Sequence, residues 1–388
     1  MTKNQKTRVA LVVPHIFLHR DILPYVIFSP GRLALDLAEN LKNEDIEVTI
    51  YTPGPIDSTV ASVHADMTYF SKELEGRGDS YIELLKKHPF TFVSLARQVQ
   101  SEIIAKAFKA ANDGKHDIVH VYTNEEDTAL PFSSLCIKPV IFTHHDPFNF
   151  LIKYKNVFPK YPYLNWLSLS FAQRTSMPAT TNWIGNIYHG LNSETFTPIP
   201  NPSDDYIAYL GRIIEPKGVH LAIDAIKEYN RTAKKPLKLK IAGKHYSDSN
   251  KDSYWQNSIL PRLDDTIEYV GFLKTDKEKQ LFLANAKALI VPSVFNEPFG
   301  MVLIESLACG TPIIGLNSGA IPEIITSKNG ILVTKKDDER ATILDLSKAV
   351  AIAESIDRKE CRLDFEKRFT IERMAHDHAN LYRSLLIR

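Results

Sequence analysis

Two glutamates, Glu297 and Glu305, flank the start of an expected helix with seven residues between them. The glycine at the mouth of that helix, Gly300, allows a ligand to approach the backbone closely. A helix N-terminus offers unpaired N–H groups and a partial positive charge, which suit a phosphate group. Carboxylates about two turns apart could hold hydroxyls at the two ends of a sugar–diphosphate–ribose ligand. An ordinary β–α–β crossover with two solvated glutamates would show the same pattern.

The surrounding residues predict the elements that would position these groups. Ala288–Val291 is a short apolar run that ends at Pro292, which predicts a strand buried on both faces of a parallel sheet. A helix is expected from about Phe299 to Ala308, with Pro298 in its first turn and Gly310 at its C-terminal cap. The next strand is expected to begin at residue 311. This order of elements is a β–loop–α–β unit.

This stretch closely resembles the signature of the retaining family 4 glycosyltransferases, which have the GT-B fold. The resemblance is carried by Glu297-Pro298-Phe299-Gly300, by Glu305, and by the segments 308–312 (A-C-G-T-P) and 319–323 (G-A-I-P-E). It implies an α/β architecture of two Rossmann-like, doubly wound domains that face a central cleft. It also implies that Glu297 contacts the donor sugar and that Glu305 binds the ribose. The main-chain groups that would bind the diphosphate and sugar belong to Phe299, Gly300, Met301 and Val302.

Two basic residues follow the strand expected at Tyr206–Leu210. Arg212 and Lys217 are five residues apart across a turn, so both side chains could reach one pair of phosphates. A basic pair on the surface is the alternative, but the segment resembles the G-R-x-x-x-x-K-G pattern of the same family, which implies diphosphate binding. Strands are also expected at 237–243 and 267–270. Gly243 is a donor-side candidate because it lies at the carboxyl end of the first of these strands, which would face the crevice. The resemblance implies that main-chain groups after the second strand, with Gly271 and Phe272 as candidates, contact the nucleobase.

The N-terminal half begins with a Rossmann-like pattern. A strand at 8–14 leads into a long loop, a helix from Gly31 to about Asn43, and a second strand at 47–51. Family members often carry a Gly-Gly pair here, whereas this chain has Ser-Pro-Gly, so only Gly31 is a candidate on the acceptor side. Residues 52–79 are polar and predict a surface excursion. Residues 80–112 predict helix with a break near Pro89.

The strand expected at 139–143 ends in His144-His145-Asp146-Pro147, and the carboxyl ends of strands face the ligand crevice in such sheets. By resemblance, His145 takes the role of the family histidine that reaches the donor sugar and the acceptor. Asp146 stands where the family usually has glycine. It could recognise an acceptor hydroxyl or amine, or it could cap the following helix.

Composition limits the remaining possibilities. The chain has 388 residues and a net charge of +1, enough for two domains and without the excess of basic residues expected of a nucleic-acid partner. No apolar run is long enough for a signal peptide or a membrane span. Three distant cysteines indicate inert thiols, and a cytoplasmic location is expected. The predicted domains are residues 1–195 and 203–370, with a final helix at 371–388 that the GT-B resemblance places back on the first domain.

These observations predict a retaining glycosyltransferase that moves a hexosyl unit from a nucleotide sugar, with UDP-glucose or a relative as the default donor. The acceptor would be a small molecule, a glycan or a lipid head group. Arg212, Lys217 and the helix mouth would stabilise the departing diphosphate. No D-x-D cluster is present, so neither a metal nor a cofactor besides the donor is expected. A sugar-nucleotide epimerase of the same fold and a non-catalytic nucleotide-sugar-binding protein are the alternatives.

Overall fold

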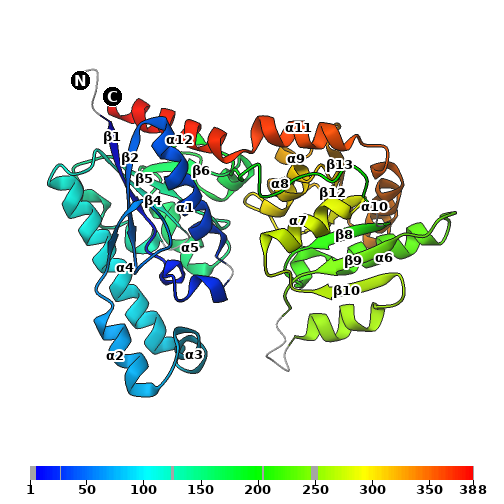
Figure 1. Cartoon of the computed structure of the whole chain (residues 1–388), viewed down its shortest axis with the longest axis horizontal. Coiled ribbons are helices and arrows are strands. Elements are labelled where there is room, and N and C mark those ends of the chain that lie inside the picture. The colour runs from blue at the N-terminus through cyan, green and yellow to red at the C-terminus, as the bar shows by residue number, and fades with distance from the viewer. Residues whose placement is uncertain (1–5, 27, 124–125, 203–204, 246–251, 388) are drawn as a thin grey trace. The chain divides into compact units, whose positions relative to one another are not determined.

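Two parallel sheets organise the chain, each in a unit of its own (Figure 1). The computed structural model describes residues 6–26, 28–123, 126–202, 205–245 and 252–387. The first unit runs to Ile187 and also contains the chain from Ile371 onward, and the second unit is Tyr188–Thr370. This is the α/β class of two Rossmann-like domains that the sequence predicts.

The sheet of the first unit has the strand order β3-β2-β1-β4-β5-β6-β7, with every pair parallel. The order reverses between β1 and β4, which makes that point the topological switch where such sheets bind ligands. The strands are β1 Thr7–Val12, β2 Ile46–Thr52, β3 Ala61–His64, β4 Ile118–Tyr122, β5 Val140–Thr143, β6 Asn165–Ser168 and β7 Trp183–Asn186.

Helices cover this sheet with apolar stripes. In α1, Ser29–Leu41, the buried residues recur at helical spacing (Leu33, Leu37 and Leu41 among them), because one face of the helix packs on the strands. The long helix α4, Pro89–Asn112, follows the short helices α2, Thr68–Arg77, and α3, Tyr81–Lys87. Helix α5 is Ile152–Val157, and α12, Ile371–Ile387, lies beside α1 (Figure 1).

The sheet of the second unit has the order β10-β9-β8-β11-β12-β13, again all parallel, and it reverses between β8 and β11. Its strands are β8 Tyr206–Leu210, β9 Lys238–Ala242, β10 Ile267–Gly271, β11 Ala288–Val291, β12 Ile313–Leu316 and β13 Gly330–Val333. Its helices are α6 Val219–Asn230, α7 Asp276–Asn285, α8 Met301–Ala308, α9 Ile321–Ile324, α10 Glu339–Ala353 and α11 Arg358–Arg368. The predicted unit of strand, loop, helix and strand is therefore β11, α8 and β12.

Some predicted elements differ from the structure. Residues 52–79 are not only a surface excursion, because they contain β3 and α2; β3 is a half-exposed edge strand and α2 buries only Phe70, so neither has a strong hydrophobic pattern. Helix α8 begins at Met301, so Pro298 lies outside its first turn. Strands β6 and β7 and helix α11 were not predicted. Helix α11 buries only Cys361 and Phe365.

The predicted domain boundaries at 195 and 203 also differ from the units of the structure. Residues 188–195 lie with the second unit because they contact its core. The amide of Leu191 donates to the carbonyl of Phe369 at 2.9 Å, and the ring of His189 packs 4.9 Å from that of Phe299.

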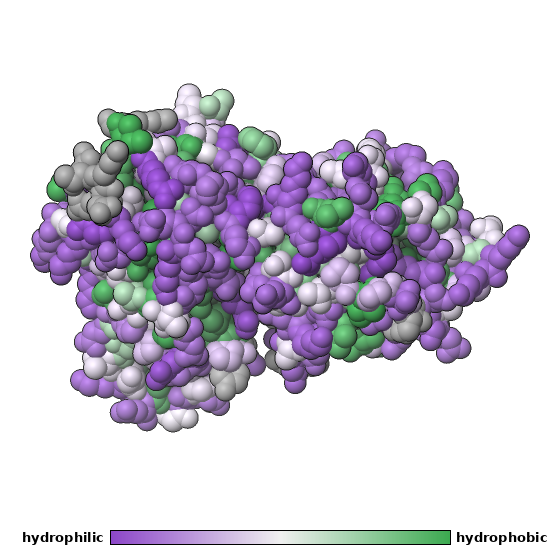
Figure 2. Space-filling view, turned by 45° about the horizontal axis from the view of Figure 1, so that its top comes forward, coloured by the Kyte–Doolittle hydropathy of each residue, from purple (hydrophilic) through white to green (hydrophobic). Residues whose placement is uncertain are grey.

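The face shown in Figure 2 is mostly hydrophilic, with hydrophobic side chains in smaller areas between. The most exposed large hydrophobic side chain in the described parts is Phe90, at the start of α4, with 91% of its area accessible. Among the described helices, none combines the length and the apolar character needed to cross a membrane.

Candidate functional site

The carboxyl edge of the second sheet gathers most of the predicted site residues. At its switch point, the loop after β8 carries Arg212 and Lys217, and the loop after β11 carries Glu297. These loops follow the neighbouring strands β8 and β11. From β8 the chain continues to β9 on one side of the sheet, and from β11 it continues to β12 on the other side. The switch point therefore brings together residues about 80 positions apart in the sequence.

Lys217 and Glu297 form an ion pair at this point. The ammonium of Lys217 contacts Oε1 of Glu297, and the hydroxyl of Ser293 donates to the same oxygen at 3.0 Å. The ring of Phe295 lies 5.1 Å from the Lys217 ammonium. Only 17% and 10% of the two charged side chains are accessible, so the pair is partly desolvated. A partly buried pair of this kind holds both side chains in defined positions.

Backbone contacts fix the two loops against each other. The amides of Val294 and Phe295 donate to the carbonyl of Pro216 at 2.9 and 3.0 Å. Gly218 has a positive φ of 69°, and a Cβ there would lie 2.1 Å from the carbonyl oxygen of Pro292. Glycine at position 218 thus allows the loop that carries Lys217 to approach the end of β11 closely.

A second glycine supports Glu297 from the loop after β12. Gly319 has a φ of 53°, and a Cβ there would lie 2.4 Å from the amide nitrogen and 2.5 Å from the carbonyl oxygen of Glu297. The amide of Ala320 donates to the carbonyl of Glu297 at 2.9 Å. The segment 319–323, which the sequence singled out only by resemblance, therefore has a physical role in placing Glu297.

The mouth of α8 begins at a glycine with a positive φ. Gly300 is the N-cap with a φ of 97°, and Met301 and Val302 are the first two helical residues, whose amides have no partner within the helix. The side chain of Phe299 is only 2% accessible and packs on His189 and Phe369. The side chain of Phe299 therefore belongs to the core of the second unit and does not line a ligand site.

Glu305 lies one turn further into α8, next to the start of α7. Its Oε1 is 3.8 Å from the ammonium of Lys279, which also contacts Asp276 at 2.8 Å. Burial raises the pKa of the Glu305 carboxyl, the charge of Lys279 opposes this shift, and Asp276 adds to it. Lys279 was not predicted from sequence. Its position one turn into α7 gave no signal, because α7 was not expected to contact Glu305.

The remaining donor-side candidates line the same edge. A Cβ at Gly243 would lie 1.8 Å from the carbonyl oxygen of Gly211, so the ends of β8 and β9 approach closely there. Gly271 ends β10, no heavy atom lies within 4 Å of where its Cβ would be, and the next residue, Phe272, is 46% accessible. Arg212 is exposed at the end of β8, and its carbonyl accepts the hydroxyl of Tyr209 at 3.0 Å.

The first unit places His145 and Asp146 directly after β5. His145 is buried, with its ring 4.4 Å from that of Tyr122. The side-chain amide of Gln173 donates to the carbonyl of Asp146 at 3.1 Å and so fixes the backbone of this loop. The helix-cap alternative for Asp146 is wrong, because α5 begins at Ile152 with Leu151 as its N-cap and has no side-chain cap.

The end of β1 carries a histidine that sequence reasoning did not select. His15 accepts the amide of Phe17 at 3.2 Å, and its ring lies 4.4 Å from that of Phe28. Burial, with the charge of Lys153 nearby, lowers the pKa of His15 to about 3. The sequence signal that could have selected His15 was its position shortly after the first strand of the sheet. Gly31 packs against Phe28, since a Cβ there would lie 2.6 Å from that ring.

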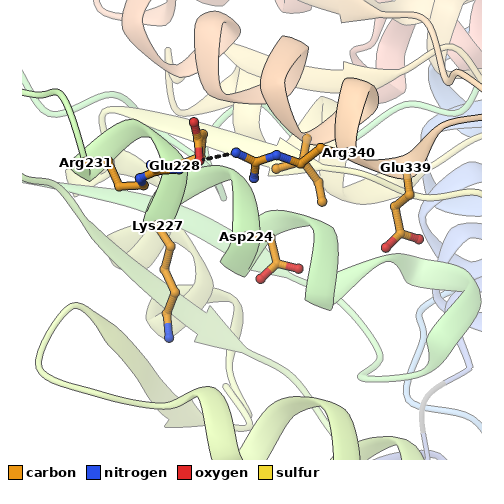
Figure 3. A pocket seen from close by; sticks show the side chains of 7 residues that line it. Asp224, Lys227, Glu228, Arg231, Glu339 and Arg340 are labelled. Carbon is orange, nitrogen blue, oxygen red and sulfur yellow. Dashed lines mark hydrogen bonds and ion pairs between the residues drawn. The ribbon is translucent and has the colours of Figure 1, made fainter.

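A hollow in the second unit lies outside this edge, between the outer helices α6 and α10 (Figure 3). Its charged side chains pair with one another or with neighbours: Arg340 contacts Glu228 at 2.7 Å, and Arg262 contacts Asp224 at 2.8 Å. No loop at the carboxyl ends of the strands contributes to it. In the parts of the chain that the structure describes, no three His, Cys, Asp or Glu side chains gather in a way that could hold a metal ion.

Comparison with known proteins finds a family match within the second unit. Residues 194–358 match the family Glycosyl transferases group 1. The uncharacterized glycosyltransferase MJ1178 of Methanocaldococcus jannaschii is 30% identical over 203 residues, which are 51% of this chain and 53% of that protein. The chain thus spans about half the length of that relative. The putative glycosyltransferase YtcC of Bacillus subtilis is 23% identical over 87% of this chain and 86% of its own length.

Solved structures agree with the fold. Sucrose-phosphate synthase from Thermosynechococcus elongatus superposes with a TM-score of 0.69 at 18% identity, over 98% of this chain and all of that one. Anabaena Alr3699/HepE, solved in complex with UDP and glucose, superposes with a TM-score of 0.65 at 14% identity, over 97% of this chain and all of that one. At these identities, the likeness establishes the GT-B fold with its two Rossmann-like domains and no more.

Proposed function

On the premise that residues 194–358 belong to the group 1 glycosyl transferases, we propose that this chain is a retaining glycosyltransferase. It transfers a hexosyl unit from a nucleotide sugar, in the first instance a UDP-sugar, to an acceptor that carries a hydroxyl or an amine. UDP-sugars are the first choice because the similar fold of Anabaena Alr3699/HepE was solved with UDP and glucose. Retention is proposed from the resemblance of the segment around Glu297 and Glu305 to the retaining family.

One observation carries the proposal. The ion pair between Lys217 and Glu297 lies at the switch point of the second sheet, where the mouth of α8 at Gly300 also begins three residues later in the chain. A cation, a carboxylate and a helix N-terminus are three groups that together can bind the parts of a sugar diphosphate. The cation and the helix amides suit the diphosphate, and the carboxylate suits the sugar hydroxyls.

The proposed chemistry follows from the charges of these groups. Cleavage of the bond between the sugar and the diphosphate leaves growing negative charge on the diphosphate, so fixed positive groups stabilise the transition state more than the ground state. Lys217, the exposed Arg212 and the amides of Met301 and Val302 are the groups that would supply this stabilisation. Glu297 would orient the sugar, and Glu305 would accept hydrogen bonds from the ribose hydroxyls. No metal or other cofactor is part of the proposal.

The acceptor side of the proposal rests on the loop after β5. His145 would contact the sugar or the acceptor, and Asp146 would accept a hydrogen bond from an acceptor hydroxyl or amine. The side chain of Asp146 does not cap α5, and ligand recognition is the role that we propose for it. The backbone of this loop is held by Gln173, which donates to the carbonyls of His144 and Asp146.

The test is a panel of nucleotide sugars, first screened by thermal shift and then assayed for nucleotide release with mixed acceptors. Lys217→Ala and Arg212→Ala should each lower kcat by about 10²–10³-fold, as the loss of one preorganised donor does at other charged transition states. Lys227→Ala is the matched control, because Lys227 lies in the same unit and pairs with Asp264 at 2.9 Å away from the carboxyl edge. Unchanged turnover in both site variants would exclude the diphosphate assignment.

The products distinguish the alternatives. Transfer requires that a glycosylated product appears together with free nucleotide. An isomerised sugar nucleotide without any acceptor would identify an epimerase, and binding without turnover of any donor would identify a binding protein.

A further inference from the structure

A buried hydrogen-bond chain links the C-terminal helix to the strand that ends beside His145. The hydroxyl of Tyr382, in α12, lies 2.8 Å from Nδ1 of His120, in the middle of β4. Nε2 of the same imidazole lies 2.7 Å from the hydroxyl of Thr143, the last residue of β5. All three side chains are fully buried, so water does not compete for these bonds.

Ring contacts continue this chain to His145. The ring of Tyr122 lies 5.4 Å from that of His120 and 4.4 Å from that of His145, in edge-on arrangements. Helix α12 supplies a second ring, His378, 5.8 Å from His120 and 6.3 Å from Tyr122. Nδ1 of His378 donates to the carbonyl of Met374 at 2.8 Å, which fixes the orientation of this ring on its own helix.

The polar character of this cluster requires an explanation, because apolar side chains would pack there without the cost of burying polar groups. His378 and Tyr382 are four residues apart, so both lie on the buried face of α12. A neutral imidazole has one donor and one acceptor, and His120 uses both of its nitrogens. The ring of His120 is therefore fixed in one orientation, and the ring of Tyr122 that packs on it is fixed as well.

We propose that Tyr382 and His378 of α12 are positioning residues for His145. They act through His120 and Tyr122, and they make α12 a part of the proposed acceptor side. This proposal rests on the proposed function, because the role of His145 toward the sugar or the acceptor is taken from it. Its structural content, that the hydrogen bond of Tyr382 determines the position of the His145 ring, is independent of any activity.

The first test is Tyr382→Phe, which keeps the ring and removes the hydroxyl. Tyr51→Phe is the matched control, because the hydroxyl of Tyr51 makes a buried 2.8 Å bond to His116 in the same unit. We expect kcat to fall about tenfold in Tyr382→Phe at unchanged donor KM, the rate equivalent of one lost buried bond. Tyr51→Phe should lower Tm by about as much as Tyr382→Phe does, but it should leave kcat unchanged. Equal kcat values for the two variants would overturn the proposal.

The second test does not require activity. In protein labelled with ¹⁵N and ¹³C at histidine, the ring signals of His145 are assigned by their loss in His145→Gln. Tyr382→Phe should shift the His145 signals, and Tyr51→Phe should not. Thr143→Val removes the other hydrogen-bond partner of His120 and should shift the same signals. This variant keeps the test possible if Tyr382→Phe does not fold. Signals of His145 that stay in place in both Tyr382→Phe and Thr143→Val refute the proposal, whether or not the chain transfers a sugar.

Discussion

Replacement of Gly319 by alanine tests how Glu297 is held. The change adds one methyl group at a backbone φ of 53°, which costs an L-residue about 1–2 kcal/mol in the left-handed region. In addition, that methyl carbon would lie 2.4 Å from the amide nitrogen of Glu297, whereas such contacts essentially never fall below 3.0 Å. The carbonyl oxygen of Glu297 would lie 2.5 Å from the same methyl carbon, and because both contacted atoms belong to the backbone, the loop that carries Glu297 has to move.

The expected effect on activity follows from that movement. A displacement of the order of 1 Å at a positioned group costs about 10²-fold in rate, or about 2.7 kcal/mol at 1.36 kcal/mol for each factor of ten. We therefore expect Gly319→Ala to lower kcat/KM for the donor by about 10²-fold, measured as the rate of nucleotide release. Its stability, measured by thermal unfolding, should fall by at least the cost of the left-handed residue.

Gly114→Ala separates the two contributions. Gly114 also has a positive φ, 78°, but no heavy atom lies within 4 Å of where its Cβ would be. This control should lose stability by about 1–2 kcal/mol and keep its activity. If Gly319→Ala loses no more turnover than Gly114→Ala, the contact between Gly319 and Glu297 does not determine the position of the carboxylate.

Three further outcomes are expected. Activity should survive EDTA, because Lys217 and Arg212 supply the positive charge; loss on chelation that magnesium or manganese restores would contradict this. Asp146→Asn should raise the acceptor KM about tenfold, as expected for the loss of one hydrogen bond to a charged group, and it should leave donor affinity unchanged. If the variant weakens donor binding alone, Asp146 belongs to the donor pocket. Donor affinity should fall as the pH is lowered through the raised pKa of Glu305, because a protonated carboxyl loses acceptor capacity. Lys279→Met should move that fall to higher pH, measured as the Kd of UDP by calorimetry, and an unchanged midpoint would show that Lys279 does not act on Glu305.

Local patterns in the sequence were sufficient for the central unit of the fold. The strand β11 has the predicted bounds, and Gly310 follows α8 with a φ of 68° as a cap glycine does. These features depend on neighbours within a few residues, such as a buried apolar run or a glycine after a helix. Residues 61–77 lacked such a pattern, because β3 and α2 bury few side chains, and the surface-excursion prediction missed them.

The family resemblance, too, was readable from the chain alone, because its motifs are short and contiguous around Glu297. What each motif residue does physically was not readable. The glycine of the segment 319–323 packs on the backbone of Glu297, and the side chain of Phe299 belongs to the core. Neither fact follows from the spacing of residues.

The tertiary structure decided which distant residues meet. Lys217 and Glu297 pair across 80 positions because the order of strands in a parallel sheet sets which loops become neighbours. His120 and Tyr382 meet across 262 positions because α12 packs against β4. That order results from the packing of all helices and strands together, so no local segment encodes it. The sequence determined by itself the chemical groups and the elements that carry them. The packed sheets determined that Lys217 is held by a carboxylate and that α12 contacts β4, the neighbour of the strand before His145.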